Sequence, residues 1–206
     1  MAPPRELMSP RFARALQCAA ASHRSQTRRG SDVPYVEHAV AVAWILERLG
    51  FGEDVVIAGL LHDVVEDTEV TLSQVDAQFG PEVARVVADC SEVKLDSQGN
   101  KRPWMDRKRD HLAALAGASV ASRAVVLADK LHNLLSIELD VLDGRPIWSL
   151  FHAERDQVLW YYRATIDQLG TGEVRIEALA DRCREALTRI ETIGDPTGAA
   201  ATTDVP

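Results

Sequence analysis

An imidazole and three carboxylates stand within six residues of one another in an otherwise apolar stretch of the sequence, at His62, Asp63, Glu66 and Asp67. The leucines and valines around them follow a helical period. Two interpretations of this cluster are open. The charges could lie on the solvated face of a helix, or they could surround a divalent cation, which would offset the cost of burying carboxylates. The apolar residues on both sides leave little room for a solvated face and favour the cation.

The spacing of the four residues predicts which of them share a face. Residues four apart on a helix lie one above the other, so His62 would stack on Glu66, and Asp63 on Asp67. The apolar period continues on both sides of the cluster. We therefore expect one continuous helix over residues 52–68, with the polar side chains on its inner face.

A metal site needs further ligands, and two polar residues in other apolar segments are candidates. His38 stands in "YVEHAVAVAWIL" and Asp129 in "AVVLADKLHNLL". Taken alone, such a histidine is more often a hydrogen-bonded core residue, and Asp129 could pair with a neighbour such as Lys130. Together with His62 and Asp63 they provide two imidazoles and two carboxylates. That set suits Mn²⁺, Fe²⁺ or Zn²⁺ better than Ca²⁺ or Mg²⁺, which prefer oxygen ligands.

The remaining sequence predicts the elements that position these residues. Helix-start signals, helix-stop signals and apolar periodicity indicate helices throughout, and no stretch reads convincingly as a strand. The predicted helices cover residues 9–25, 35–50, 52–68, 71–80, 81–93, 104–116, 119–142, 150–169 and 173–193. The expected fold class is therefore all-α, a bundle of about seven to nine helices.

The length and composition indicate one domain. A chain of 206 residues suffices for one well-buried core, which we expect over residues 9–193. Residues 1–8 are expected to be flexible. Residues 194–206 contain few bulky apolar side chains and are expected to be disordered.

The charge and the cysteines restrict the partners and the compartment. A net charge of −8 argues against a general nucleic-acid binder, which needs a basic surface. No apolar run approaches the roughly 20 residues of a membrane span, and the N-terminus lacks the apolar core of a signal peptide. Three widely spaced cysteines without a CxxC pair fit reduced thiols. We expect a cytoplasmic protein that binds neither nucleic acid nor membrane, and the sequence leaves its oligomeric state open.

The arrangement of His38, the adjacent His62 and Asp63, and Asp129 resembles that of the HD-domain metal-dependent phosphohydrolases. The surrounding sequence narrows the resemblance to the hydrolase domain of the Rel/Spo alarmone enzymes, and above all to the stand-alone small alarmone hydrolases. The matching segments are "VPYVEHAVAVAWIL", "AGLLHDVVEDTEVTLSQVDAQFGPEVARVV", "WMDRKRDHL" and "VVLADKLHNL". The resemblance runs from about residue 10 to residue 170.

The resemblance implies a chemistry for the polar cluster. His38, His62, Asp63 and Asp129 would hold one divalent metal, usually Mn²⁺ in that family. Glu66 and Asp67 match the acidic pair that orients or activates the attacking water. The substrate would be the stringent-response alarmone guanosine tetraphosphate or pentaphosphate (ppGpp or pppGpp), a guanine nucleotide. Loss of its 3′-pyrophosphate would leave GDP or GTP, the work of a phosphoric diester hydrolase.

The resemblance also implies contacts with the nucleotide. Arg28 and Arg29 would flank the guanine, and Asn133 would contact the sugar-phosphate region. Tyr162 belongs to an aromatic segment that closes one side of the pocket in relatives, and Lys108 is one of several basic residues that could bind the pyrophosphate. A solvated basic loop for the arginines and a helix-packing role for the tyrosine are the alternatives.

Three departures from the family pattern bear on the substrate, and one of them is the basic loop over residues 28–34, which differs in length from the commonest version. Leu135 stands where the alarmone hydrolases usually carry an arginine, and Val126 stands where they often carry a lysine. Neither residue belongs to the expected ligand set or to the acidic pair. Two alternatives therefore stay open. One is an HD phosphohydrolase of another nucleotide, such as NADPH or a nucleoside triphosphate, and the other is a non-catalytic nucleotide-binding module.

Overall fold

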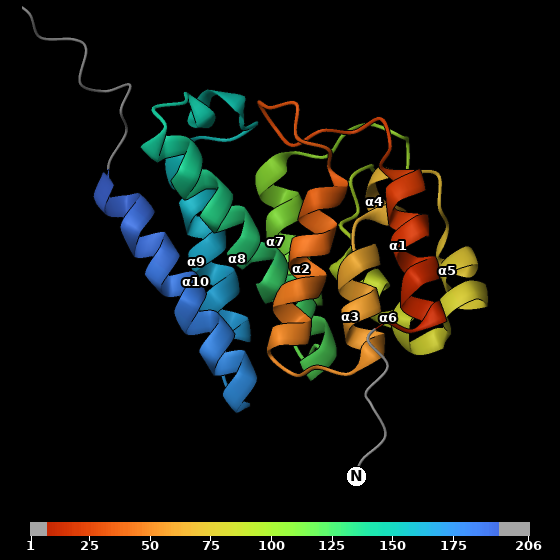
Figure 1. The fold of residues 1–206 in the computed structure, drawn as a ribbon. Coiled ribbons are helices and arrows are strands. Elements are labelled where there is room, and N and C mark those ends of the chain that lie inside the picture. The colour runs from red at the N-terminus through yellow and green to blue at the C-terminus, as the bar shows by residue number, and fades with distance from the viewer. Residues whose placement is uncertain (1–7, 194–206) are drawn as a thin grey trace, which may run out of the picture. The chain divides into compact units, whose positions relative to one another are not determined.

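The computed structural model describes residues 8–193, and helices joined by loops make up this part of the chain (Figure 1). This range contains ten α-helices, one short 3₁₀ helix and no β-strand, which confirms the predicted all-α class. The described residues form two compact units. The first unit runs to Glu92 and includes Ala124–Val126, and the second comprises Val93–Arg123 and the residues from Leu127 onward. The expectation of one domain over residues 9–193 stays a prediction.

The first unit is built around a buried central helix, α3. Every residue of α3 from Val56 to Leu61 is buried, as expected for a helix that is apolar on all sides. This helix packs against α1, α2 and α6, and α5 packs against α6. The helices of the unit are α1 (Pro10–Ser22), α2 (Val36–Arg48), α3 (Glu53–Leu61), α4 (Val64–Asp67), α5 (Leu72–Phe79) and α6 (Pro81–Cys90).

Local capping residues fix several helix ends in this unit, as the sequence predicts. The Ser9 hydroxyl accepts a hydrogen bond from the Phe12 amide at the start of α1. Thr71 and Gln74 form a reciprocal capping box on α5. Gly50, with a φ of +72°, ends α2 in a conformation that a residue with a Cβ rarely adopts. The predicted starts of α1 and α5 and the predicted end of α2 are therefore confirmed.

The expectation of one helix over residues 52–68 is wrong. Helix α3 ends at Leu61, and α4 begins only at Val64, so His62 and Asp63 form a turn between two helices. The His62 imidazole bonds the Gly59 carbonyl, an acceptor that a continuous helix would reserve for the amide of residue 63. The Asp67 amide then donates to the Asp63 carbonyl and starts the next turn. The break therefore falls at the two residues with the strongest ligand signature.

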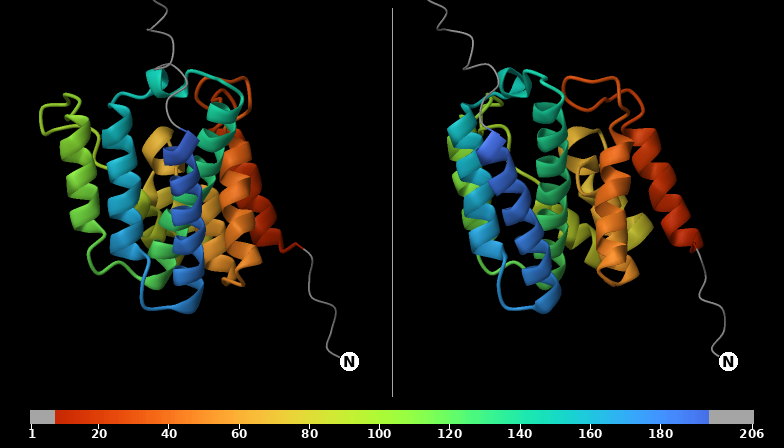
Figure 2. Two further views of the ribbon diagram at one scale, coloured as in Figure 1. Left: turned by 90° about the vertical axis from the view of Figure 1, so that its left-hand side faces the viewer. Right: turned by 60° about the vertical axis from the view of Figure 1, so that its left-hand side comes forward.

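The second unit contains four α-helices and the 3₁₀ helix, apart from Ala124–Val126 of α8, which belong to the first unit. Its elements are α7 (Trp104–Ala114), α8 (Val120–Leu142), the 3₁₀ helix η1 (Ile147–Leu150), α9 (Arg155–Leu169) and α10 (Val174–Ile193). Helix α9 lies between α7 and α10 and packs against both (Figure 2). The Arg123 side chain near the start of α8 donates to the carbonyl groups of Leu169, the last residue of α9, and of Thr171, just beyond it.

Some predicted boundaries differ in this unit. The helix predicted from residue 150 begins at Arg155, where Glu154 and Gln157 form a capping box. The expected flexible and disordered ends lie outside the described residues, apart from the exposed Met8. Within the described range, no helix is both long and apolar enough to cross a membrane.

Cys183 on α10 is expected to resist labelling in the native protein. Its side chain is fully buried, and burial raises the pKa of the thiol from 9.0 to about 12. The thiolate is therefore scarce at pH 8. Because the pKa of Cys183 is higher in the folded protein than in the unfolded chain, the folded state should lose stability as the pH rises from about 9 toward 12. Mass spectrometry after thiol labelling should find Cys183 modified only in urea, with the partly exposed Cys90 as the internal reference. Rapid labelling of Cys183 in the native protein would contradict this expectation.

Candidate functional site

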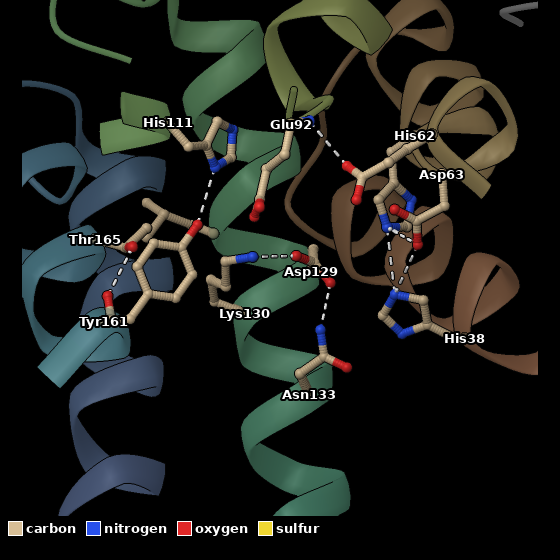
Figure 3. A network of polar contacts seen from close by, with 12 residues as sticks. His38, His62, Asp63, Glu92, His111, Asp129, Lys130, Asn133, Tyr161 and Thr165 are labelled. Atoms are coloured by element: carbon tan, nitrogen blue, oxygen red, sulfur yellow. Dashed lines mark hydrogen bonds and ion pairs between the residues drawn. The ribbon is translucent and has the colours of Figure 1, made fainter. Parts of the chain in front are cut away.

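The first unit brings together three of the four expected metal ligands. The Nε2 atoms of His38 and His62 lie 3.2 Å apart. The Asp63 Oδ2 atom lies 2.9 Å from His62 Nε2 and 3.7 Å from His38 Nε2, and the three side chains point toward one another (Figure 3). Both imidazoles are buried, with 1% and 3% of their surface exposed. Two nitrogens and a carboxylate oxygen thus converge at a spacing that suits metal–nitrogen bonds of about 2 Å.

The hydrogen bonds of His62 fix its tautomer. Its Nδ1 atom lies 2.7 Å from the Gly59 carbonyl oxygen, which can only accept a hydrogen bond. Nδ1 therefore carries the proton in the neutral ring, and the Nε2 lone pair faces His38 and Asp63. A backbone carbonyl that orients an imidazole in this way is typical support for a metal-binding histidine.

Tyr35 supports the same cluster and was not identified from the sequence. Its hydroxyl donates to Asp63 Oδ2, and its ring meets the His38 ring edge-on at 5.5 Å between centroids. Tyr35 directly precedes α2 and stands three residues before His38. That short spacing in "PYVEH" is the signal that could have pointed to it.

The acidic pair lies in α4, directly after the turn that carries His62 and Asp63. The Glu66 carboxylate is partly buried and accepts a hydrogen bond from the Glu92 amide, 2.9 Å away. Asp67 is exposed, and its backbone carbonyl accepts a hydrogen bond from the Gln26 side chain. Glu66 is therefore held by the segment that follows α6, whereas Asp67 is the more exposed member of the pair.

The predicted arginine pair lies in residues 24–35, the basic loop between α1 and α2. The loop is ordered by an antiparallel bridge between Thr27 and Pro34 and by a turn at Gly30, whose φ is +69°. The Arg28 guanidinium carbon lies 5.7 Å from the centre of the Tyr35 ring, and Arg29 is exposed. Tyr35 thus contacts both an expected metal ligand and an expected nucleotide-binding residue.

Asp129, the fourth expected ligand, lies on α8 in the second unit. Lys130 Nζ is 2.6 Å from its Oδ2 atom, and the Asn133 amide donates to Oδ1 (Figure 3). The ion pair of the alternative interpretation is therefore present, although a carboxylate held in this way keeps lone pairs for a cation. Burial acts to lower the pKa of Lys130, but the Asp129 charge outweighs it, so the pKa lies well above its usual value. Asn133, whose expected contact with the nucleotide stays a prediction, donates a hydrogen bond to Asp129.

An aromatic and basic cluster surrounds Tyr161 in the second unit. Lys108 Nζ lies 4.5 Å from the centre of the Tyr161 ring, and Lys130 Nζ lies 5.4 Å from it. The Tyr161 hydroxyl pairs with His111 Nδ1 at 2.9 Å. Lys108, one of the expected pyrophosphate ligands, therefore contacts Tyr161, while the neighbouring Tyr162 is buried with 7% of its surface exposed. From the sequence, Lys130 was expected only as a possible ion-pair partner of Asp129.

Replacing Gly59 by alanine is expected to destabilise the fold. A Cβ atom there would lie 2.4 Å from the Cδ1 atom of Leu46, which is fully buried on α2. Such overpacking costs about 1–3 kcal/mol, and the better helix propensity of alanine offsets about 1 kcal/mol of it. Because Leu46 is fully buried and has little room to move, we expect urea unfolding to show a loss toward the upper end of the difference, up to about 2 kcal/mol. In a double-mutant cycle, Leu46→Val should cost less beside Gly59→Ala than alone, whereas an unchanged or raised stability of Gly59→Ala would contradict the steric argument.

A known family profile matches most of the chain. The sequence profile of the HD domain matches residues 15–151. The curated relatives include guanosine-3′,5′-bis(diphosphate) 3′-pyrophosphohydrolase MESH1 of Drosophila melanogaster, which is 34% identical over 177 residues, 84% of this chain and 92% of that protein. The human protein of the same name is 34% identical over 168 residues, 80% of this chain and 88% of its own length.

Solved structures give the same similarity in three dimensions. One, described as a metazoan orthologue of SpoT that hydrolyses ppGpp, matches with a TM-score of 0.72 and 31% identity, covering 87% of this chain and 97% of that chain. Another, from Listeria monocytogenes, matches with a TM-score of 0.65 and 34% identity, covering 78% and 99%. The sequence and structural comparisons therefore agree.

Proposed function

The chain belongs to the HD-domain family, and from this premise we propose that it removes the 3′-pyrophosphate of ppGpp or pppGpp, leaving GDP or GTP and pyrophosphate. The observation that carries the proposal is the convergence of His38, His62 and Asp63 in the first unit. The relatives that cover most of the chain, and are 34% identical to it, bear the name of this activity.

Family membership implies a divalent metal, and the residues of this chain fit one. His38, His62 and Asp63 each present one ligand atom within the first unit, and Asp129 is the proposed fourth ligand. Two imidazoles and two carboxylates suit Mn²⁺, which we propose as the natural metal, with Fe²⁺ and Zn²⁺ as alternatives. When bound, the metal would lower the pKa of a water molecule and so supply a nucleophile near neutral pH.

The chain's own side chains would carry out the rest of the reaction. We assign to Glu66 and Asp67 the tasks of orienting the attacking water and accepting its proton. Arg28 and Arg29 would hold the guanine, where a guanidinium can stack on the ring. Asn133, Lys108 and Tyr162 remain proposed nucleotide contacts.

Incubation of the purified protein with ppGpp and Mn²⁺ tests the proposal. GDP and pyrophosphate should appear at a rate that chelation abolishes and Mn²⁺ restores. Replacement of Mn²⁺ by Fe²⁺ or Zn²⁺ in the same assay decides the metal. The absence of both products from a folded, metal-loaded sample would overturn the proposal. A cytoplasmic location is part of the proposal, in keeping with three free thiols.

A second candidate function is hydrolysis of a different nucleotide. It is favoured by Leu135, a partly buried apolar residue on α8 where the alarmone hydrolases usually carry an arginine. A panel of ppGpp, pppGpp, NADPH and nucleoside triphosphates distinguishes the two functions. A clearly higher kcat/KM for NADPH or a nucleoside triphosphate than for ppGpp and pppGpp would favour this second function over the first. A non-catalytic module is disfavoured because binding alone does not require Glu66 and Asp67.

A further inference from the structure

Within the first unit, hydrogen bonds from Tyr35 and Gln26 link the basic loop to the segment after α3. Tyr35 donates to the Asp63 carboxylate, as described above. The Gln26 side-chain amide donates to the backbone carbonyl of Asp67 at 2.8 Å. The second contact joins residues 41 positions apart, and the chemistry proposed above gives it no role.

The side chain of Gln26 is fixed at both of its polar atoms. Its Nε2 atom donates to the Asp67 carbonyl, so its Oε1 atom is the one that faces His23 Nδ1 at 2.8 Å. An amide oxygen only accepts, and Nδ1 of His23 is therefore the donor. His23 is 1% exposed, and its backbone amide closes the end of α1 by bonding the Ala19 carbonyl. Gln26 thus bridges the capped end of α1 and the backbone of Asp67.

The backbone of Gln26 is held as well, and it leads directly to the arginine pair. The Tyr35 amide donates to the Gln26 carbonyl at 2.9 Å, and the Arg28 amide donates to the Val33 carbonyl at 2.8 Å. The ring of Tyr35 also packs against His23, with 4.8 Å between centroids. A displacement of Gln26 would therefore be passed along the basic loop to Arg28.

We propose that Gln26 is a positioning residue, which holds the basic loop in register with Asp67 so that the arginine pair and the acidic pair engage one nucleotide together. This inference rests on the proposed function, because it takes Arg28 and Arg29 as nucleotide contacts. A loop fixed in advance loses less conformational freedom when the ligand binds. The hydrogen bond from Gln26 to Asp67 should therefore contribute to substrate affinity more than to the chemical step.

The kinetic test is Gln26→Met, which keeps the size of the side chain and removes both hydrogen bonds. We expect KM for ppGpp to rise about fivefold, equivalent to about 1 kcal/mol for one net hydrogen bond, with kcat changed less than about twofold. The matched control is Gln168→Met in the second unit, which removes a similar bond, from the Gln168 amide to the Leu112 carbonyl at 2.6 Å. The control should leave KM unchanged.

Hydrogen exchange supplies a measurement that does not depend on activity. Gln26→Met should speed exchange of the loop amides of Arg28, Ser31 and Tyr35, whereas Gln168→Met should not. If the wild type fails to hydrolyse ppGpp, the proposed function fails, while the exchange comparison still decides whether Gln26 holds the loop. Gln26→Asn, too short to reach both partners, serves if the methionine variant misfolds. Unchanged KM and unchanged exchange in a folded variant would overturn the inference.

Discussion

The double replacement Glu66→Gln with Asp67→Asn is expected to lower kcat for ppGpp hydrolysis by about 10²–10⁴-fold, the usual contribution of general acid–base catalysis. Both side chains keep their size and lose their charge and their basicity. Glu66→Gln retains a side-chain oxygen that can accept the hydrogen bond from the Glu92 amide, so the segment after α6 stays anchored. Metal binding should persist because His38, His62 and Asp63 are untouched. Steady-state kinetics and Mn²⁺ titration of the same sample separate these two effects.

A matched control removes the same two charges elsewhere in the first unit. Glu69→Gln with Asp76→Asn alters two exposed carboxylates outside the expected ligand set and acidic pair. Its kcat should stay close to that of the wild type. Single variants then apportion the effect between the partly buried Glu66 and the exposed Asp67. Full turnover in the Glu66 and Asp67 double variant would show that the water is activated by other groups.

Replacement of His62 by alanine is expected to weaken Mn²⁺ binding by more than about 100-fold, because even groups that only orient a ligand contribute 10–100-fold. His62 provides a buried Nε2 lone pair whose tautomer the Gly59 carbonyl fixes. Turnover should fall with the metal. Calorimetric titration with Mn²⁺ measures the affinity. Thermal unfolding with and without Mn²⁺ gives a second measure, since an ion that binds only the folded state stabilises it.

The control for this prediction is His152→Ala, at an exposed histidine in the second unit. It should bind Mn²⁺ as the wild type does and show the same metal-dependent stabilisation. His62→Ala should unfold at the same temperature with or without Mn²⁺. If the two variants bound Mn²⁺ equally well, His62 would not be a ligand.

Much of the fold follows from local signals, but the break at His62 does not. Ser9, Gly50 and Thr71 mark helix ends through their own backbone and side-chain preferences, which act within a few residues. The break depends on a side chain competing with the backbone for the Gly59 carbonyl. Apolar periodicity, which continues through residues 52–68, carries no trace of that competition. The capping box of Glu154 and Gln157 is a local signal for the start of α9, but apolar periodicity alone places that start at residue 150.

The candidate site likewise contains residues that the sequence predicts and residues that it does not. His38, His62 and Asp63 could be predicted because an imidazole or a carboxylate in an apolar segment is unusual, and the structure brings these three together. Gln26 could not, since a glutamine in a polar loop is ordinary, and for Tyr35 the short spacing to His38 is the one signal in the sequence. Their contacts to Asp63 and Asp67 join residues 28 and 41 positions apart. They arise only when α1, α2 and α3 pack against one another.

The end of α3 at Leu61 has a consequence for the order in which ligands bind. Aligned peptide dipoles give the C-terminal end of a helix a partial negative charge, and His62 and Asp63 follow that end directly. With Glu66 and Asp67 one turn further on, this region repels a polyphosphate until a cation neutralises it. We therefore expect compulsory order, with the divalent ion binding before the nucleotide, and a nucleotide affinity that is negligible in chelator.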